Sequence, residues 1–133
     1  MAREEIINKL IDEAIKILNN SYAPYSNIHV AAIVYTDKGN IYKGVNVENS
    51  SYGLTICAER SAISAMVTAG ERTPQIIVIV TDYSEPIPPC GACRQVIAEF
   101  NPKAMIVMYS IKSRKKIVTS LDKLFPQPFK LSL

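Results

Sequence analysis

The sequence of 133 residues lacks long apolar runs and a targeting signal. Its apolar stretches, such as QIIVIV at residues 75–80, are far shorter than the about 20 residues that span a bilayer. The first residues, MAREEIINKL, carry acidic side chains from the start and do not follow the pattern of a secretory signal peptide. There is also no repeat, low-complexity segment or linker. We therefore expect a single domain over residues 1–133, cytoplasmic and without a membrane partner.

Cysteine and histidine are scarce as well. The chain has three cysteines and one histidine, His29. An odd number of cysteines argues against a disulfide framework, and in a reducing compartment cysteines more often bind metal or take part in catalysis. The three cysteines lie in two short stretches, TICAERS at residues 55–61 and PCGACRQV at residues 89–96. This clustering points to one chemical site.

The chain carries little net charge. Its formal net charge is +3, and its basic run is KSRKK at residues 112–116. A run of this length in a predicted turn is more typical of a solvated tip than of a nucleic-acid interface. We therefore do not expect a nucleic-acid partner.

Hydrophobic periodicity predicts four helices and five strands. Apolar residues at helical spacing indicate a helix near the N-terminus, and helical patterns also begin at both cysteine stretches. Short runs rich in β-branched residues indicate buried strands, and two strands flanking DKG indicate a hairpin. Helices are expected at residues 3–19, 57–69, 90–100 and 120–125, and strands at residues 29–36, 40–47, 75–82, 104–110 and 116–120. This order predicts an α/β fold: three layers, α/β/α, around a mixed five-stranded sheet.

The cysteines lie where predicted helices begin. Cys57 opens one helix, and Cys90 and Cys93 open another, one turn apart. Unpaired N–H groups and the helix dipole stabilise thiolates there. Three thiolates suit a catalytic zinc ion with one open position, since a structural zinc usually has four protein ligands. His29 could be a fourth ligand, although a lone strand histidine is more often simply packed or exposed. A C-x-x-C pair also fits redox chemistry or packing, but a dithiol pair leaves Cys57 without a role.

Charged residues follow the cysteines directly. Glu59 lies two positions after Cys57, where a first-turn carboxylate is mildly favoured by the dipole and can also reach the open position of the metal. A carboxylate placed there can accept a proton from water. Three thiolates on Zn²⁺ leave a negative site, which Arg60 or Arg94 could offset. Of the two, Arg60 is the better candidate, and a surface salt bridge is the alternative for each.

CAER followed by PCGACRQV is similar to the zinc-dependent nucleoside deaminases. The sequence most resembles the cytidine deaminases of the small, tetrameric type, and YAPYSN, GNIYKGVNVENSSYG, CAERSAI and LFPQPF extend the resemblance over nearly the whole chain. The resemblance implies one Zn²⁺ per subunit and a homotetramer with sites shared between subunits. It also implies hydrolysis of cytidine and deoxycytidine to uridine and deoxyuridine plus ammonia, in pyrimidine salvage.

The same resemblance assigns roles to individual residues. The three cysteines hold zinc, and Glu59 moves protons between water, ring N3 and the leaving amine. Substrate contacts fall on Asn46 and Glu48 at the ribose, the backbone N–H of Ala58 at the pyrimidine, and Tyr52 and Phe129 at a neighbouring subunit's site, with Phe129 as a lid. Gln95 supports the metal cysteines. Ile28 replaces the family's base-stacking aromatic residue, which removes a stacking contribution.

Two other functions remain open from the sequence. One is deamination of another aminopyrimidine nucleoside such as blasticidin S, whose deaminases share the zinc motifs. The pair Asn46 and Glu48 argues against it, without excluding it. The other is a catalytically silent, zinc-stabilised module that binds RNA through residues 112–116. Substrate comparison separates the first alternative, and loss of the Glu59 carboxylate separates the second.

Overall fold

The computed structural model describes residues 2–132 and contains, within them, the nine predicted elements in the predicted order. Two short 3₁₀ turns, η1 (Leu18–Asn20) and η2 (Tyr52–Leu54), add to them. The helices are α1 (Arg3–Ile17), α2 (Ala58–Thr68), α3 (Gly91–Phe100) and α4 (Leu121–Leu124). The strands are β1 (Val30–Thr36), β2 (Ile41–Val45), β3 (Pro74–Thr81), β4 (Met105–Ser110) and β5 (Lys116–Ser120). No helix of this stretch has the length and apolar character that crossing a membrane requires.

The five strands form one mixed sheet in the order β2-β1-β3-β4-β5. Strands β3 and β4 run parallel, joined through α3, and the other neighbouring pairs are antiparallel. The predicted hairpin is the β1–β2 pair, in which Ile33 lies opposite Lys43. Strand β2 is shorter than predicted and ends at Val45, because the following residues turn away to bridge Tyr22 and Ile56 through Val47.

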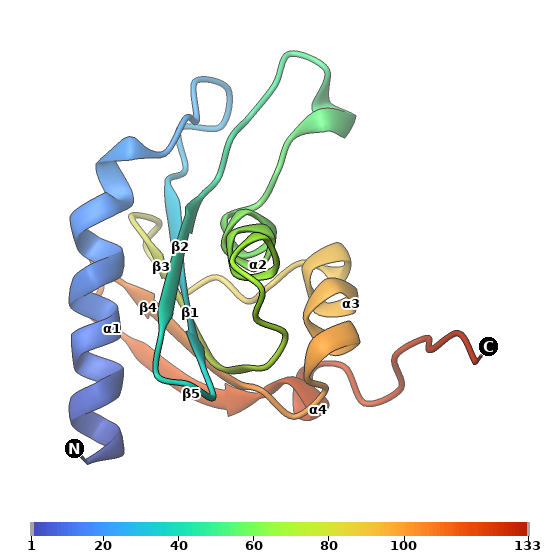
Figure 1. The fold of residues 1–133 in the computed structure, drawn as a ribbon. Helices are drawn as coiled ribbons and strands as arrows, with labels where there is room; N and C mark the ends of the chain where they lie inside the picture. The colour runs from blue at the N-terminus through green and yellow to red at the C-terminus, as the bar shows by residue number, and fades with distance from the viewer. Residues whose placement is uncertain (1, 133) are drawn as a thin grey trace.

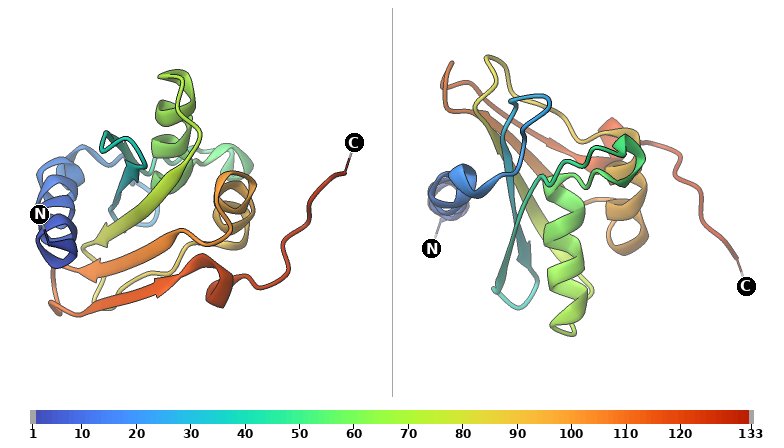
Figure 2. Two further views of the ribbon diagram at one scale, coloured as in Figure 1. Left: turned by 60° about the horizontal axis from the view of Figure 1, so that its bottom comes forward. Right: turned by 90° about the horizontal axis from the view of Figure 1, so that it is seen from above.

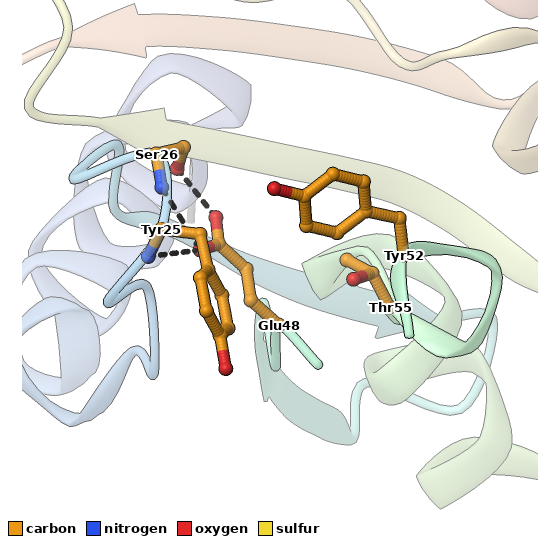
Figure 3. Close-up of a pocket in the computed structure, with 5 residues that line it drawn as sticks. All are labelled: Tyr25, Ser26, Glu48, Tyr52 and Thr55. Atoms are coloured by element: carbon orange, nitrogen blue, oxygen red, sulfur yellow. Dashed lines mark hydrogen bonds between the residues drawn. The ribbon is translucent and has the colours of Figure 1, made fainter. Parts of the chain in front are cut away.

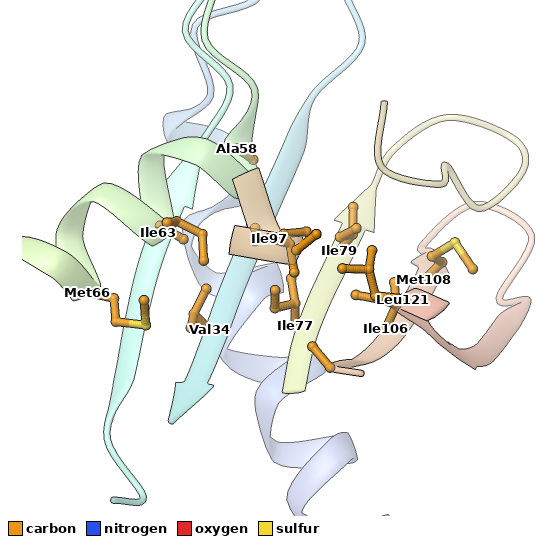
Figure 4. Close-up of a cluster of buried hydrophobic side chains, with 14 residues drawn as sticks. Val34, Ala58, Ile63, Met66, Ile77, Ile79, Ile97, Ile106, Met108 and Leu121 are labelled. Carbon is orange, nitrogen blue, oxygen red and sulfur yellow. The ribbon is translucent and has the colours of Figure 1, made fainter. Parts of the chain in front are cut away.

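Helices cover both faces of the sheet, as the three-layer prediction requires (Figures 1 and 2). Successive strand residues point to opposite faces, so adjacent residues belong to different cores. Ile33 and Val78 pack with α1, whereas Val34 and Ile77 pack with α2 and α3 (Figure 4). The predicted α/β/α fold is confirmed.

The topology brings both cysteine stretches to one end of the sheet. The chain reaches α2 through residues 46–57 after β2, and it reaches α3 through residues 82–90 after β3. Helices α2 and α3 lie beside each other on the same face (Figure 1). Their N-terminal ends therefore carry the candidate site, and the C-terminal end of α2 lies at the far end of the domain.

Glu71 lies buried at that far end of the domain, just beyond α2. Its side chain is only 6% exposed and accepts hydrogen bonds from the Tyr42 hydroxyl and from Asn40 Nδ2, the latter at 2.8 Å. These contacts tie α2 to the β1–β2 hairpin. The hydrogen bond from Tyr42, with others from Thr36 and Asn40, holds the pKa of Glu71 below its ordinary value of 4.5.

This carboxylate gives a pH-dependent contribution to folding. Because the pKa of Glu71 is lower in the folded state, its stabilising effect is present above about pH 4.5 and is lost as the pH falls through the folded-state value. Glu71→Gln should therefore be less stable than wild type at pH 7, and the difference should shrink on acidification. Urea unfolding of both proteins at pH 7 and pH 3.5 measures this difference. A gap that stays constant would contradict the assignment.

Candidate functional site

The three cysteine sulfurs converge at the N-termini of α2 and α3. Cys57 and Cys90 occupy the N-cap positions of α2 and α3, and Cys93 lies buried in the first turn of α3. All three Sγ atoms lie within 4.8 Å of one another, and Cys57 Sγ is 3.7 Å from Cys90 Sγ. Zinc–sulfur bonds of about 2.3 Å in a tetrahedron place the sulfurs about 3.8 Å apart. The cluster therefore fits a zinc ion without rearrangement of this pair.

The surroundings of the sulfurs favour the thiolate at Cys57. The hydrogen bond with Cys93, followed by the contact of Arg60, lowers the pKa of Cys57 to about 5. The same hydrogen bond and burial raise the pKa of Cys93. Arg60 Nη2 lies 3.8 Å from Cys57 Sγ and donates to the Thr55 carbonyl at 3.2 Å. Arg60 is thus placed to offset the negative charge of a three-thiolate site.

No fourth protein ligand joins these sulfurs among residues 2–132. His29 is engaged elsewhere, with Nδ1 2.7 Å from Asp82 Oδ2 and its backbone N–H donating to Asp82 Oδ1. The open interpretation of His29 as a ligand therefore finds no support in the geometry. A zinc ion held by three thiolates keeps one coordination position for water or substrate, as catalytic zinc sites do.

The cluster faces a cavity of about 160 Å³. Glu59 reaches into it from the first turn of α2, and its side chain is only 5% exposed. Burial, followed by the charge of Cys57, raises the pKa of Glu59 to about 7. A carboxyl group with that pKa can hold or release a proton near neutral pH. The cavity is lined by Val30, Asn46, Thr55, Ile56, Cys57, Ala58, Glu59, Ile79, Ile87, Pro88 and Cys90.

Asn46 and Glu48 lie beyond the end of β2 rather than on the strand. Asn46 lines the cavity, and its amide accepts from Val30 N–H at 2.9 Å and donates to the Ile28 carbonyl at 2.9 Å. The Ser21 hydroxyl also donates a hydrogen bond to Asn46 Oδ1. The amide thereby holds the entry to β1 in place, and one of its two amide hydrogens is not engaged in these bonds.

Glu48 lines a second hollow of about 260 Å³ (Figure 3). Its carboxylate accepts from the N–H groups of Tyr25 and Ser26 at 3.0 and 3.1 Å, and the Ser26 hydroxyl donates to its second oxygen. That hydroxyl lowers the pKa of Glu48, so the group is ionised near neutral pH. Tyr52 borders the same hollow with 75% of its surface exposed and meets Tyr25 edge to face at 6.1 Å.

The two hollows share Thr55 and therefore adjoin. Each is smaller than the about 300–1,000 Å³ usual for small-molecule sites. A ligand that fills both would contact Glu59 at one end and Glu48 at the other.

Six expected residues line neither hollow: Ile28, Arg60, Cys93, Arg94, Gln95 and Phe129. Arg94 donates from Nε to the Pro89 carbonyl at 2.9 Å and from Nη1 to the Leu124 carbonyl at 3.3 Å. Gln95 donates from Nε2 to the Phe129 carbonyl at 3.0 Å. Phe129 itself is 70% exposed. The structure thus directs the side chains of Arg94 and Gln95 toward backbone carbonyls rather than toward sulfur.

Comparison with known proteins decides the family. A profile of the cytidine and deoxycytidylate deaminase zinc-binding region matches residues 4–109, which include all three cysteines. The chain belongs to this family. A cytidine deaminase of Sporosarcina psychrophila is 42% identical over 123 residues, covering 92% of this chain and 90% of that protein. The crystal structure of a cytidine deaminase from Burkholderia pseudomallei has a TM-score of 0.87 and 39% identity, covering 97% of this chain and 100% of that one.

A blasticidin-S deaminase of Bacillus cereus is also similar, although less so. It is 30% identical over 106 residues and covers 74% of each chain. The alternative substrate class named from the sequence is therefore represented among the relatives. The cofactor of this deaminase family is zinc, and the three cysteines of this chain are positioned to hold one ion.

Sequence reasoning did not anticipate several apolar residues that line the deaminase cavity. Ile79 and Val30 come from neighbouring strands, and Ile87 and Pro88 come from the loop before Cys90. Ile28, expected at the base, is half-buried at the entry to β1 and contributes its carbonyl to Asn46. Only the prolines of residues 84–89 gave a signal, since they mark a loop that leads directly into the second cysteine stretch.

Proposed function

We propose that this chain catalyses the hydrolytic deamination of cytidine and deoxycytidine, giving uridine and deoxyuridine plus ammonia. One observation carries the proposal. The three-cysteine cluster opens into a cavity that also contains a buried glutamate with a pKa of about 7. A structural metal site needs neither an open coordination position nor an acid–base group beside it.

The proposed reaction uses this chain's residues to move protons and to orient the ring. Zinc, when held by the three cysteines, supplies the Lewis acid that activates water. Glu59 accepts one proton from water and delivers it to ring N3; it then takes the second proton, from the hydroxyl added at C4, and delivers that proton to the amine that leaves C4. Water thus adds its oxygen to C4, the C4–N bond breaks, and ammonia departs. Ala58, first residue of α2, has a backbone N–H without a helical acceptor and can donate to the pyrimidine.

Recognition of the sugar falls to Glu48 and Asn46 in this proposal. An ionised carboxylate acts only as an acceptor, so Glu48 can take hydrogen bonds from sugar hydroxyls. Asn46 keeps one amide hydrogen for the same purpose while its other contacts hold β1. A site built to bond hydroxyl groups rejects ligands without them. Free cytosine should therefore be a poor substrate, and Ile28 can cover a pyrimidine face only through apolar contact.

The assembly that we propose is a cytoplasmic homotetramer that acts in pyrimidine salvage and shares sites between subunits. Support comes from large apolar side chains left exposed around the hollows: Tyr22, Tyr25, Val47, Tyr52, Leu54 and Ile56. Exposed apolar patches of this kind mark interaction surfaces. Phe129 is equally exposed on the C-terminal segment and lines neither hollow. We propose that Phe129 closes the site of a neighbouring subunit, beside Tyr52.

Phe129→Ala tests the lid. The change should raise KM for cytidine about tenfold, because burial of a phenylalanine ring against substrate contributes about 1.5–3 kcal/mol. Zinc content should not change, since Phe129 is not one of the residues that could hold the ion. Steady-state kinetics with metal analysis measures both quantities. Leu131→Ala, on the same segment, is the control. An unchanged KM in Phe129→Ala would remove this residue from the site.

The function itself is tested by a substrate panel with purified, zinc-loaded protein. Loss of ultraviolet absorbance should be rapid with cytidine and deoxycytidine, and slow or absent with cytosine and blasticidin S. If blasticidin S is converted faster than cytidine, the proposed substrate is wrong and the chain is a deaminase of that other substrate class. If the zinc-bound protein converts none of these substrates, the result would favour the alternative of a catalytically silent, zinc-stabilised module. RNA binding by that module has little support, because Lys115 and Lys116 already pair with Glu85 and Glu4.

A further inference from the structure

Helix α3, which contains Cys93 and has Cys90 as its N-cap, also contacts the C-terminal segment at two points. Beyond α4 the chain forms no helix or strand as far as residue 132, and it runs outward past α3 (Figures 1 and 2). Gln95 Nε2 donates to the Phe129 carbonyl at 3.0 Å, and Glu99 Oε2 lies 3.4 Å from Lys130 Nζ. Between residues 126–132 and the rest of residues 2–132, the structure contains no other hydrogen bond or ion pair.

The two contacts join neighbouring positions on the helix to neighbouring positions on the segment. Gln95 and Glu99 are four positions apart on α3, so their side chains share one face about one helical turn apart. They engage consecutive residues of the segment, Phe129 and Lys130, in the same direction along the chain. Arg94 holds the end of α4, directly before the segment, by donating to the Leu124 carbonyl at 3.3 Å. Side chains of α3 therefore hold the segment at Phe129 and Lys130.

The contact with Gln95 leaves the aromatic ring free. It uses the backbone carbonyl of Phe129, and the residue as a whole stays 70% exposed. A neutral amide is suited to this role because it can donate to a carbonyl, whereas a carboxylate of equal size cannot. The pair Glu99–Lys130 is exposed on both sides and contributes less. Gln95 is the main attachment point.

We infer that Gln95, assisted by Glu99, is a positioning residue that fixes where Phe129 is presented to a neighbouring subunit's pocket. The inference rests on the proposed function, in which Phe129 closes that pocket. Under this inference, Gln95 of one subunit affects the reaction in the pocket of the neighbouring subunit, although its own side chain does not line that pocket. This role differs from support of the metal cysteines, which the resemblance to the deaminases implied for it.

The test combines Gln95→Glu with Phe129→Ala in the full-length, zinc-loaded protein. Gln95→Glu keeps the side-chain size but removes the donor, and it should raise KM for cytidine about fivefold, as expected for one ordinary hydrogen bond. The kcat value, zinc content and thermal unfolding midpoint should stay near wild type. In the Phe129→Ala background, Gln95→Glu should have no further effect on KM, because the group that it positions is gone. Trypsin should cleave after Lys130 faster in Gln95→Glu.

The ion pair between Glu99 and Lys130 is tested by exchanging the two charges. Glu99→Lys and Lys130→Glu should each raise KM slightly, and the double exchange should restore it. If Phe129→Ala raises KM and Gln95→Glu does not, the positioning role is overturned while the lid stands. If Gln95→Glu raises KM equally in both backgrounds, the glutamine acts elsewhere and the inference is also overturned. If Phe129→Ala leaves KM unchanged, the lid of the proposed function fails, and the inference with it.

Discussion

Glu59→Gln should lower kcat for cytidine by at least about 10²–10⁴-fold, the usual contribution of a positioned general acid–base group. Glu59 lies in the cavity beside the cysteine cluster, 5% exposed, with its pKa raised to about 7 by burial. Glutamine has nearly the same shape and keeps the hydrogen-bonding oxygen, but it cannot take a proton from water. The loss should therefore appear in catalysis rather than in folding.

Zinc content and circular dichroism must accompany the kinetics of Glu59→Gln. Both should match wild type, since Glu59 is not one of the three sulfur ligands. The matched control is Glu71→Gln, because Glu71 is buried to a similar degree at the far end of α2. That control should lose stability but keep kcat. A Glu59→Gln protein that retains zinc and full activity would refute the assigned proton transfer and revive the silent-module alternative.

The fold was predictable because its signals are local. A short apolar run rich in β-branched residues predicted β3, whose adjacent residues Ile77 and Val78 face different helices. The cysteines were predictable as a site because each stretch marks the start of a helix, where Cys57 and Cys90 serve as N-caps. Because these helix starts meet at one end of the sheet, residues distant in sequence could be placed together without predicting any individual contact between them.

Other parts of the site depend on contacts between distant segments, for which the sequence carries no local signal. Asn46 looked like a strand residue facing the sugar, yet β2 ends at Val45 and the amide is largely engaged with Val30 and Ile28. The contact of Gln95 with Phe129 joins residues 34 positions apart. The resemblance assigned Gln95 to the support of the metal cysteines, and its side-chain amide donates to the Phe129 carbonyl.

Gly44→Ala should destabilise the domain by about 1–3 kcal/mol or more and reduce zinc retention. A Cβ at Gly44 would lie 2.4 Å from Ala62 N, 2.5 Å from Ala58 O and 2.8 Å from Ser61 Cβ. Two of these atoms belong to the backbone of α2 and cannot rotate away, so β2 and α2 must separate. Such a shift would move Cys57, the N-cap of α2, relative to the cysteines of α3.

Two comparisons make the Gly44 prediction specific. Gly53→Ala should leave the unfolding free energy within about 0.5 kcal/mol of wild type and zinc content unchanged, because a Cβ there meets no atom within 4 Å. Ser61→Gly removes the side-chain atom nearest to Gly44 but leaves both backbone atoms, so it should not rescue Gly44→Ala. Denaturant unfolding and metal analysis of the four proteins measure these outcomes. Rescue by Ser61→Gly, or a Gly44→Ala protein as stable as Gly53→Ala, would show that α2 can retreat from β2 without disturbing the metal site. The position of Cys57 would then depend on the loop before α2 rather than on the close packing of strand and helix.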